Sequence, residues 1–243
     1  MFNSKYKLFN LTCLIIGVCF VLGILWLYNG GFVKPKKPNV AINSITTIKK
    51  LDELDELPKE VNLPVPFTSQ APEKNWEQPW QDACEEAVAL MLDAYYKGYN
   101  LSPLFSKDEI LKMVEWEDKK GWGYSIEIEK LAELVEHYSS SGVLVKIIEN
   151  PTIDQIKRIL AGGSPVLVVA DGKVLPNPHF TNGGPEYHAL IIRGYTFDSF
   201  ITNDPGTQFG ENFVYKYKDL MDAIHDWNGG DVKNGRSVVL ILE

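Results

Sequence analysis

The stretch that decides the fold spans residues 82–98 and reads DACEEAVALMLDAYYKG. Its small and apolar residues recur at steps of three and four, which predicts a helix with one buried face and one wet face. Asp82 is expected to cap the start of this helix and Gly98 to end it. Cys84 lies in the first turn, where unpaired backbone N–H groups and the helix dipole favour an anion. A thiol placed there loses its proton more easily, although two glutamates follow it directly.

Cys84 is the only thiol in everything that follows the N-terminal apolar segment, because Cys13 and Cys19 both lie inside that segment. A lone thiol cannot pair within its own domain, so it is either a packed apolar group or a reactive one. Metal ligation has little support, since one usable thiol and scattered histidines lack the paired spacing of a zinc site. No metal and no cofactor are therefore expected.

The candidate base is His188, which begins the apolar stretch HALIIRGY at residues 188–195. Asp204 follows the next predicted strand and precedes a Pro-Gly turn. In an antiparallel pair the start of one strand lies close to the end of the next, so this carboxylate and the imidazole are expected to meet. Asn203 would take the place of Asp204 if the strand register shifts by one residue. Cys84, His188 and Asp204 then supply a nucleophile, a base and an orienting group.

Helical periodicity after Cys84 gives way to strand periodicity, which indicates an α+β domain with an antiparallel sheet packed against a helical part. Further helices are expected at residues 107–117, 126–137, 152–160 and 217–226. Strands are expected at residues 143–148, 165–170, 188–195, 199–203 and 237–242. An additional strand at 61–67 contains Pro64 and Pro66 and should lie at a sheet edge.

A long connection rich in Pro and Gly spans residues 171–187, directly before His188. Loops of this length in compact domains often serve as lids or binding loops. We expect it to border the substrate cleft; a plain surface excursion is the alternative.

The N-terminal segment indicates a membrane anchor. From Leu8 to Tyr28 there are 21 residues without a charge, which is enough helix to cross a bilayer. No small-x-small cleavage site follows it, although a cleaved signal, giving a secreted protein, remains the alternative. The expected organisation is a tail at 1–7, a single-pass transmembrane helix at 8–28, a stalk at 29–60 and an outward-facing domain at 61–243.

The charge of the chain bears on its partners. Its net charge is −8, and all 32 acidic residues follow Asn29. An acidic body argues against a nucleic-acid partner. The oligomeric state has no signal in the sequence.

Four segments, in this order, resemble the bacterial papain-type cysteine peptidases related to the bacteriocin-processing, double-glycine-cleaving peptidases. The segments are Val65-Pro66-Phe67-Thr68-Ser69-Gln70, Ala83-Cys84-Glu85-Glu86-Ala87, Tyr187-His188-Ala189 and Asn203-Asp204-Pro205-Gly206. The resemblance covers roughly residues 61 to 243. Four ordered motifs are more specific than any one alone.

The resemblance implies a papain-like fold in which Cys84 is the nucleophile, His188 the general base and Asp204 the orienting group. It also implies an upstream glutamine in the oxyanion hole, for which Gln70 is the best match and Gln78 and Gln81 remain rivals. One departure is Glu85, since Gly often follows the nucleophile in this family.

The activity implied is hydrolysis of a peptide or protein substrate through an acyl-enzyme. An inactive peptide-binding module and an acyl or peptidyl transferase of the same fold are the alternatives, because fold alone does not decide between them.

Overall fold

A computed structural model describes residues 56–139 and 144–243 of the chain. The tail at 1–7, the anchor at 8–28 and the stalk up to residue 55 lie outside the described residues. Within the described part of the chain, no helix combines the length and the apolar character that a bilayer crossing requires.

The first part of the domain is helical. Its helices are α3 (Cys84–Lys97), α4 (Pro103–Lys120) and α5 (Ile128–Ser139), with a short 3-10 helix η1 (Trp80–Asp82) before them. Gly98 ends α3 as predicted, in a left-handed conformation with φ of 72° that a residue without Cβ adopts easily. Asp82, in contrast, does not cap α3: it belongs to η1, and Ala83 occupies the cap position.

The second part contributes most of an antiparallel sheet. Within the described residues the sheet has seven strands, with neighbours in the order β2-β7-β3-β4-β5-β6 and with β1 added to β4. The strands are β1 (Val61–Asn62), β2 (Val145–Glu149), β3 (Val166–Ala170), β4 (His188–Tyr195), β5 (Ser199–Asn203), β6 (Phe213–Lys216) and β7 (Val238–Leu242). The helices α6 (Ile153–Ala161) and α7 (Tyr217–Ala223) and the 3-10 helices η2 (Thr181–Gly183) and η3 (Val232–Asn234) lie between strands in the chain.

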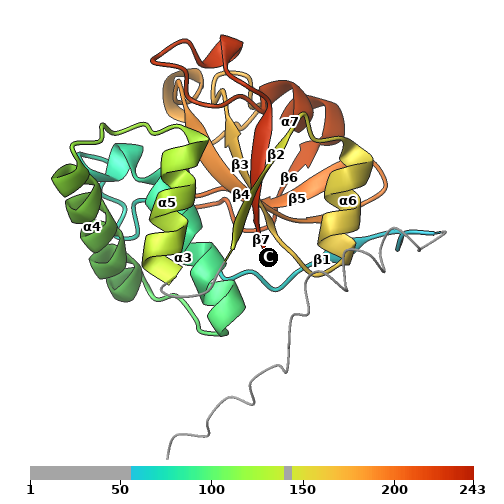
Figure 1. The fold of residues 1–243 in the computed structure, drawn as a ribbon, viewed down its shortest axis with the longest axis horizontal. Helices are drawn as coiled ribbons and strands as arrows, with labels where there is room; N and C mark the ends of the chain where they lie inside the picture. The colour runs from blue at the N-terminus through green and yellow to red at the C-terminus, as the bar shows by residue number, and fades with distance from the viewer. Residues whose placement is uncertain (1–55, 140–143) are drawn as a thin grey trace, which may run out of the picture. The chain divides into compact units, whose positions relative to one another are not determined.

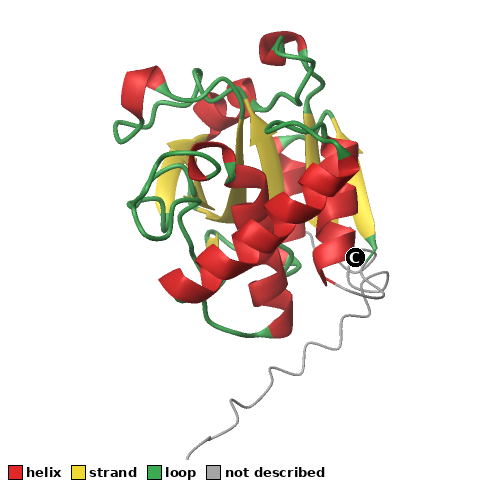
Figure 2. Ribbon diagram, turned by 90° about the vertical axis from the view of Figure 1, so that its left-hand side faces the viewer, coloured by secondary structure: helices red, strands yellow, loops and turns green. Residues whose placement is uncertain are grey.

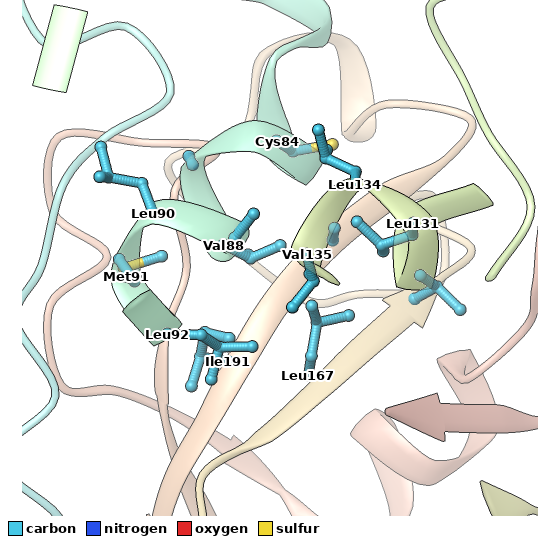
Figure 3. Close-up of a cluster of buried hydrophobic side chains, with 14 of the residues drawn as sticks. Cys84, Val88, Leu90, Met91, Leu92, Leu131, Leu134, Val135, Leu167 and Ile191 are labelled. Carbon is cyan, nitrogen blue, oxygen red and sulfur yellow. The ribbon is translucent and has the colours of Figure 1, made fainter. Parts of the chain in front are cut away.

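Helices cover both faces of this sheet (Figures 1 and 2). Because side chains alternate across a strand, Leu167 and Val169 of β3 pack with α3 and α5, whereas Val166 and Val168 pack with α6 and α7. Figure 3 shows the first of these two cores, where Cys84 lies at the edge of a group of aliphatic side chains. The nucleophile candidate is thus mounted on a helix whose apolar face is fixed against the sheet.

The predicted α+β class is confirmed, with two differences in the strands. The strand expected at 61–67 shrinks to Val61–Asn62, because Pro64 and Pro66 have no N–H to give to a ladder. Strand β6 was not predicted, although its Phe-Val-Tyr run at 213–215 has high β propensity.

Candidate active site

Cys84 is the first residue of α3 and is 4% exposed. Its Sγ donates a hydrogen bond to Oε2 of Glu85 at 2.8 Å. Burial, followed by the charges of Glu85 and Glu86, raises the pKa of the Cys84 thiol well above its ordinary value. The position at the helix start, which favours a thiolate, is therefore outweighed by desolvation and by acidic neighbours.

His188 and Asp204 meet as predicted. Strands β4 and β5 pair antiparallel with Ile191 opposite Asn203, so the start of β4 lies beside the segment that follows β5. Nε2 of His188 lies 2.7 Å from Oδ1 of Asp204, and both side chains are almost fully buried. The imidazole is thereby held by a carboxylate in the orientation that a general base requires.

The register also decides between the two candidate orienting residues. The Nδ2 amide of Asn203 donates to the carbonyl oxygen of Val65 at 3.0 Å, and its Oδ1 accepts from Nη1 of Arg193 at 3.0 Å. Asn203 therefore links the sheet to the segment at residues 65–70, whereas Asp204 faces the imidazole.

Asp204 accepts hydrogen bonds from four donors. Besides His188, they are the Nδ2 amide of Asn177 at 2.9 Å, the hydroxyl of Tyr215 at 2.6 Å and the backbone N–H of Gly206 at 2.9 Å. Burial alone would raise the pKa of Asp204, but His188, Tyr215 and Gly206 together hold it below its ordinary value. Asp204 is therefore kept as a carboxylate.

A cavity of about 630 Å³ brings the candidates together. Cys84 and His188 both line it, while Asp204 is placed behind His188 through their hydrogen bond. Because the lining residues come from the start of α3, the start of β4 and the loop after β5, the fold joins segments that are far apart in the sequence. Cys84 and His188 therefore share one cavity, and Asp204 adjoins it through His188, while their action as a triad stays a prediction.

Gln70 also lines the cavity, but its amide is already engaged. Nε2 donates to the carbonyl oxygens of Trp80 at 3.0 Å and of Gln81 at 2.9 Å, so both amide hydrogens are used. Its Oε1 is buried and has no hydrogen-bond partner within the described residues. Of the two rivals, Gln81 lines the cavity and Gln78 is absent from its lining among the described residues.

The loop at 171–187 borders the cavity, as expected. Lys173 and most of residues 179–187 contribute to the lining. The loop is closed at its base by Gly172 and Gly184: a Cβ on Gly184 would lie 2.3 Å from the carbonyl oxygen of Gly172. The backbones at residues 172 and 184 therefore pass close to each other, and the role of this loop in substrate binding stays a prediction.

Three features of the site were missed in the sequence. Asn177 and Tyr215 hold Asp204, yet they come from a loop and from the unpredicted strand β6, and no local pattern connects them with it. Glu85 accepts a hydrogen bond from the candidate nucleophile Cys84. Its position directly after Cys84, where the resembling family often has Gly, is the signal that could have revealed it.

Comparisons with known proteins bear on the same region. The model of the "Peptidase_C39 like family" matches residues 62–229. Among solved structures, one described as a C39-like peptidase from Bacillus anthracis has 18% identity and a TM-score of 0.52, covering 76% of this chain and 98% of that chain. Xylellain, a cysteine protease from Xylella fastidiosa, has 13% identity and a TM-score of 0.31, covering 82% and 88%. No curated protein matches the chain. The Bacillus anthracis structure supports the fold.

Proposed function

Because the chain belongs to the Peptidase_C39 like family and is a cysteine peptidase, we propose that it hydrolyses peptide bonds with Cys84, His188 and Asp204 as its catalytic triad. The observation that carries this proposal is the 2.7 Å bond from Nε2 of His188 to Asp204, in a cavity that the Cys84 thiol also lines. That bond leaves Nδ1 of the imidazole for the sulfur.

In the first step the proton of the Cys84 thiol moves to Nδ1 of His188. The thiolate attacks the peptide carbonyl carbon, and the carbonyl becomes an oxyanion. The backbone N–H of Cys84, at the unpaired start of α3, is one donor for this oxyanion. Gln70 is the proposed second donor, and it reaches the oxyanion only by releasing one of its two backbone carbonyl partners.

In the second step the C–N bond breaks, and His188 gives its proton to the leaving amine, so that an acyl-enzyme remains on Cys84. His188 then takes a proton from water, and the resulting hydroxide attacks the thioester carbonyl. The carboxylic product leaves, and the thiolate recovers its proton through the imidazole. Asp204 remains ionised throughout and stabilises the imidazolium.

The test is cleavage of a mixed peptide library by the full-length protein, followed by mass spectrometry. Cys84→Ala should abolish cleavage, a loss of about 10⁴-fold or more. The matched control is the double variant Cys13→Ala, Cys19→Ala, which should cleave at the parent rate. Cleavage by Cys84→Ala would contradict the proposal. An added amine that becomes joined to the acyl product would show transfer instead of hydrolysis.

The proposal extends to the place where the enzyme works. The uncharged segment 8–28 would anchor the chain in the membrane, with the peptidase domain outside the cell. Protease added to intact cells should then degrade the domain, whereas a domain protected until lysis would contradict this location.

A further inference from the structure

Glu85 is held against the nucleophile from two sides. Its Oε2 accepts the bond from the Cys84 thiol at 2.8 Å, and its Oε1 accepts from the backbone N–H of Ile126 at 3.4 Å. The side chain is only 2% exposed, and it contributes to the lining of the catalytic cavity. A carboxyl group in this position contacts the atom that has to react.

The surroundings of Glu85 leave its charge unneutralised. The titratable groups that face it are Cys84 and Glu86 on its own helix, Glu117 of α4 and Tyr187 before β4. Tyr187 directs its hydroxyl to the carbonyl oxygen of Ile126 at 2.8 Å. Within the described residues no Lys or Arg side chain is ion-paired with Glu85, although Lys173 lines the same cavity, as does His188. An anion at this site is therefore costly.

This environment changes the pKa of the Glu85 carboxyl group. Burial, and then the charge of Glu86, raises the pKa of Glu85 to about 8. Near neutral pH most molecules therefore carry Glu85 as a neutral acid, and above about pH 8 most carry it as a carboxylate.

The two protonation states have opposite effects on the sulfur. The carboxylate can only accept, so it keeps the thiol hydrogen turned toward Oε2 and repels a thiolate. The neutral acid has an O–H that can donate to the sulfur, and the thiol proton is then free to pass to Nδ1 of His188. Glu85 exchanges its proton with the solvent through the cavity that it lines, and only O–H, S–H and N–H bonds change.

We propose that Glu85 is a positioning residue that switches Cys84 between a resting thiol held by the carboxylate and a reactive sulfur released to His188 when Glu85 is protonated. The hand-over to His188 rests on the proposed function. The reactivity of the sulfur does not, because alkylation reports it without any peptide cleavage.

The experiment measures the rate at which iodoacetamide alkylates Cys84 in the full-length protein from about pH 6 to about pH 10. Mass spectrometry of the peptide that contains Cys84 separates its labelling from that of Cys13 and Cys19. In the parent protein the rate should fall about tenfold between pH 7 and pH 9, since one pH unit above its pKa leaves about a tenth of Glu85 protonated. In Glu85→Gln the fall should disappear, because the amide can donate to the sulfur at every pH.

The matched control is Glu117→Gln, which makes the same change at a buried carboxyl of α4 whose pKa is also raised to about 8. This variant should keep the alkaline fall. A fall of equal size in Glu85→Gln would overturn the inference, as would a parent rate that climbs steadily through pH 8. The second outcome decides the matter even if Glu85→Gln does not fold.

Failure of this inference is distinguishable from failure of the proposed function. If Cys84→Ala still cleaves peptides while the alkylation profile depends on Glu85, the proposed triad is wrong and the role of Glu85 stands. If Cys84→Ala is inactive and the pH dependence of Cys84 alkylation is the same in the parent and in Glu85→Gln, the proposed triad stands and the proposed switch is wrong.

Discussion

The cavity lined by Cys84 and His188 has two sides that differ in their hydrogen bonding and charge. On the sheet side, Asp204 accepts four hydrogen bonds and its pKa is lowered, so it stays ionised and holds the His188 ring in one orientation. On the helix side, Glu85, Glu86 and Glu117 are buried close together and their pKa values are all raised. The Asp204 carboxylate on one side has its hydrogen bonds satisfied, whereas burial on the other side favours the neutral form of three carboxyl groups. We therefore expect a change of pH to act on Cys84 through Glu85 and to leave Asp204 ionised.

Asp204→Asn should have the largest of these effects, because it replaces the carboxylate that accepts all four hydrogen bonds on the sheet side. An asparagine would turn an NH₂ group toward at least one of the donors His188, Asn177, Tyr215 and Gly206, which an ionised carboxylate accepts without conflict. We expect kcat/KM for peptide cleavage to fall about 10²- to 10³-fold, and the free energy of unfolding to fall by about 1–3 kcal/mol.

The check is steady-state kinetics together with urea unfolding of the variant. Asp198→Asn, the same change at an exposed aspartate just before β5, serves as the matched control and should leave His188 in place. An Asp204→Asn protein within threefold of the parent would mean that the hydrogen bonds around this carboxylate do not hold the base.

Glu117→Gln tests the helix side through stability. The pKa of Glu117 is raised from 4.5 to about 8 by burial, followed by the charges of Glu85 and Asp118. Between those pH values the folded protein binds more protons than the unfolded chain, so the free energy of unfolding falls as pH rises through this window. Glu117→Gln should be more stable than the parent by about 1–3 kcal/mol at pH 9, and the difference should vanish toward pH 4.

Denaturant titrations at several pH values measure this difference. The control is Glu115→Gln on the same helix. Glu115 is exposed and paired with Lys119, so this variant should show no increase in the free energy of unfolding at pH 9. If the free energy of unfolding of Glu117→Gln equals that of the parent at every pH, the helix side does not hold a carboxyl group with a raised pKa, and the proposed difference between the two sides is wrong.

Tyr215→Phe should have the smallest effect, since it removes one of four donors from Asp204. The lost bond of 2.6 Å is charge-assisted, and its loss should lower kcat about tenfold with little change in KM. Steady-state kinetics with a fluorogenic peptide measure kcat and KM separately. A change confined to KM would mean that Tyr215 acts on substrate binding instead of on the base.

Local pattern was enough to predict the helix of Cys84 and the meeting of His188 with Asp204. The helix follows from its apolar spacing, and the pairing of base and carboxylate follows because both lie at matching ends of consecutive antiparallel strands. These predictions needed only the spacing of the apolar residues and a short connection between two consecutive strands.

Contacts between residues far apart in the chain could not be predicted from the sequence. Tyr215 and Asn177 approach Asp204 only after β6 and the loop at 171–187 have packed, and neither carries a sequence signal for that contact. The amide of Gln70 illustrates the same limit, because the direction of its donors is set by the carbonyls of Trp80 and Gln81 in η1. Residues 8–28 lie outside the described residues, and their membrane role stays a prediction.

The most direct test of the account is whether His188 activates the Cys84 sulfur. The rate of Cys84 alkylation at pH 7 should fall about 100-fold in His188→Ala, because no other group in the proposed mechanism takes the thiol proton. The matched control is His137→Ala, which removes a histidine stacked on Trp116 and should leave the rate unchanged. A His188→Ala protein that is alkylated as fast as the parent would contradict the central claim that sulfur and imidazole work as a pair.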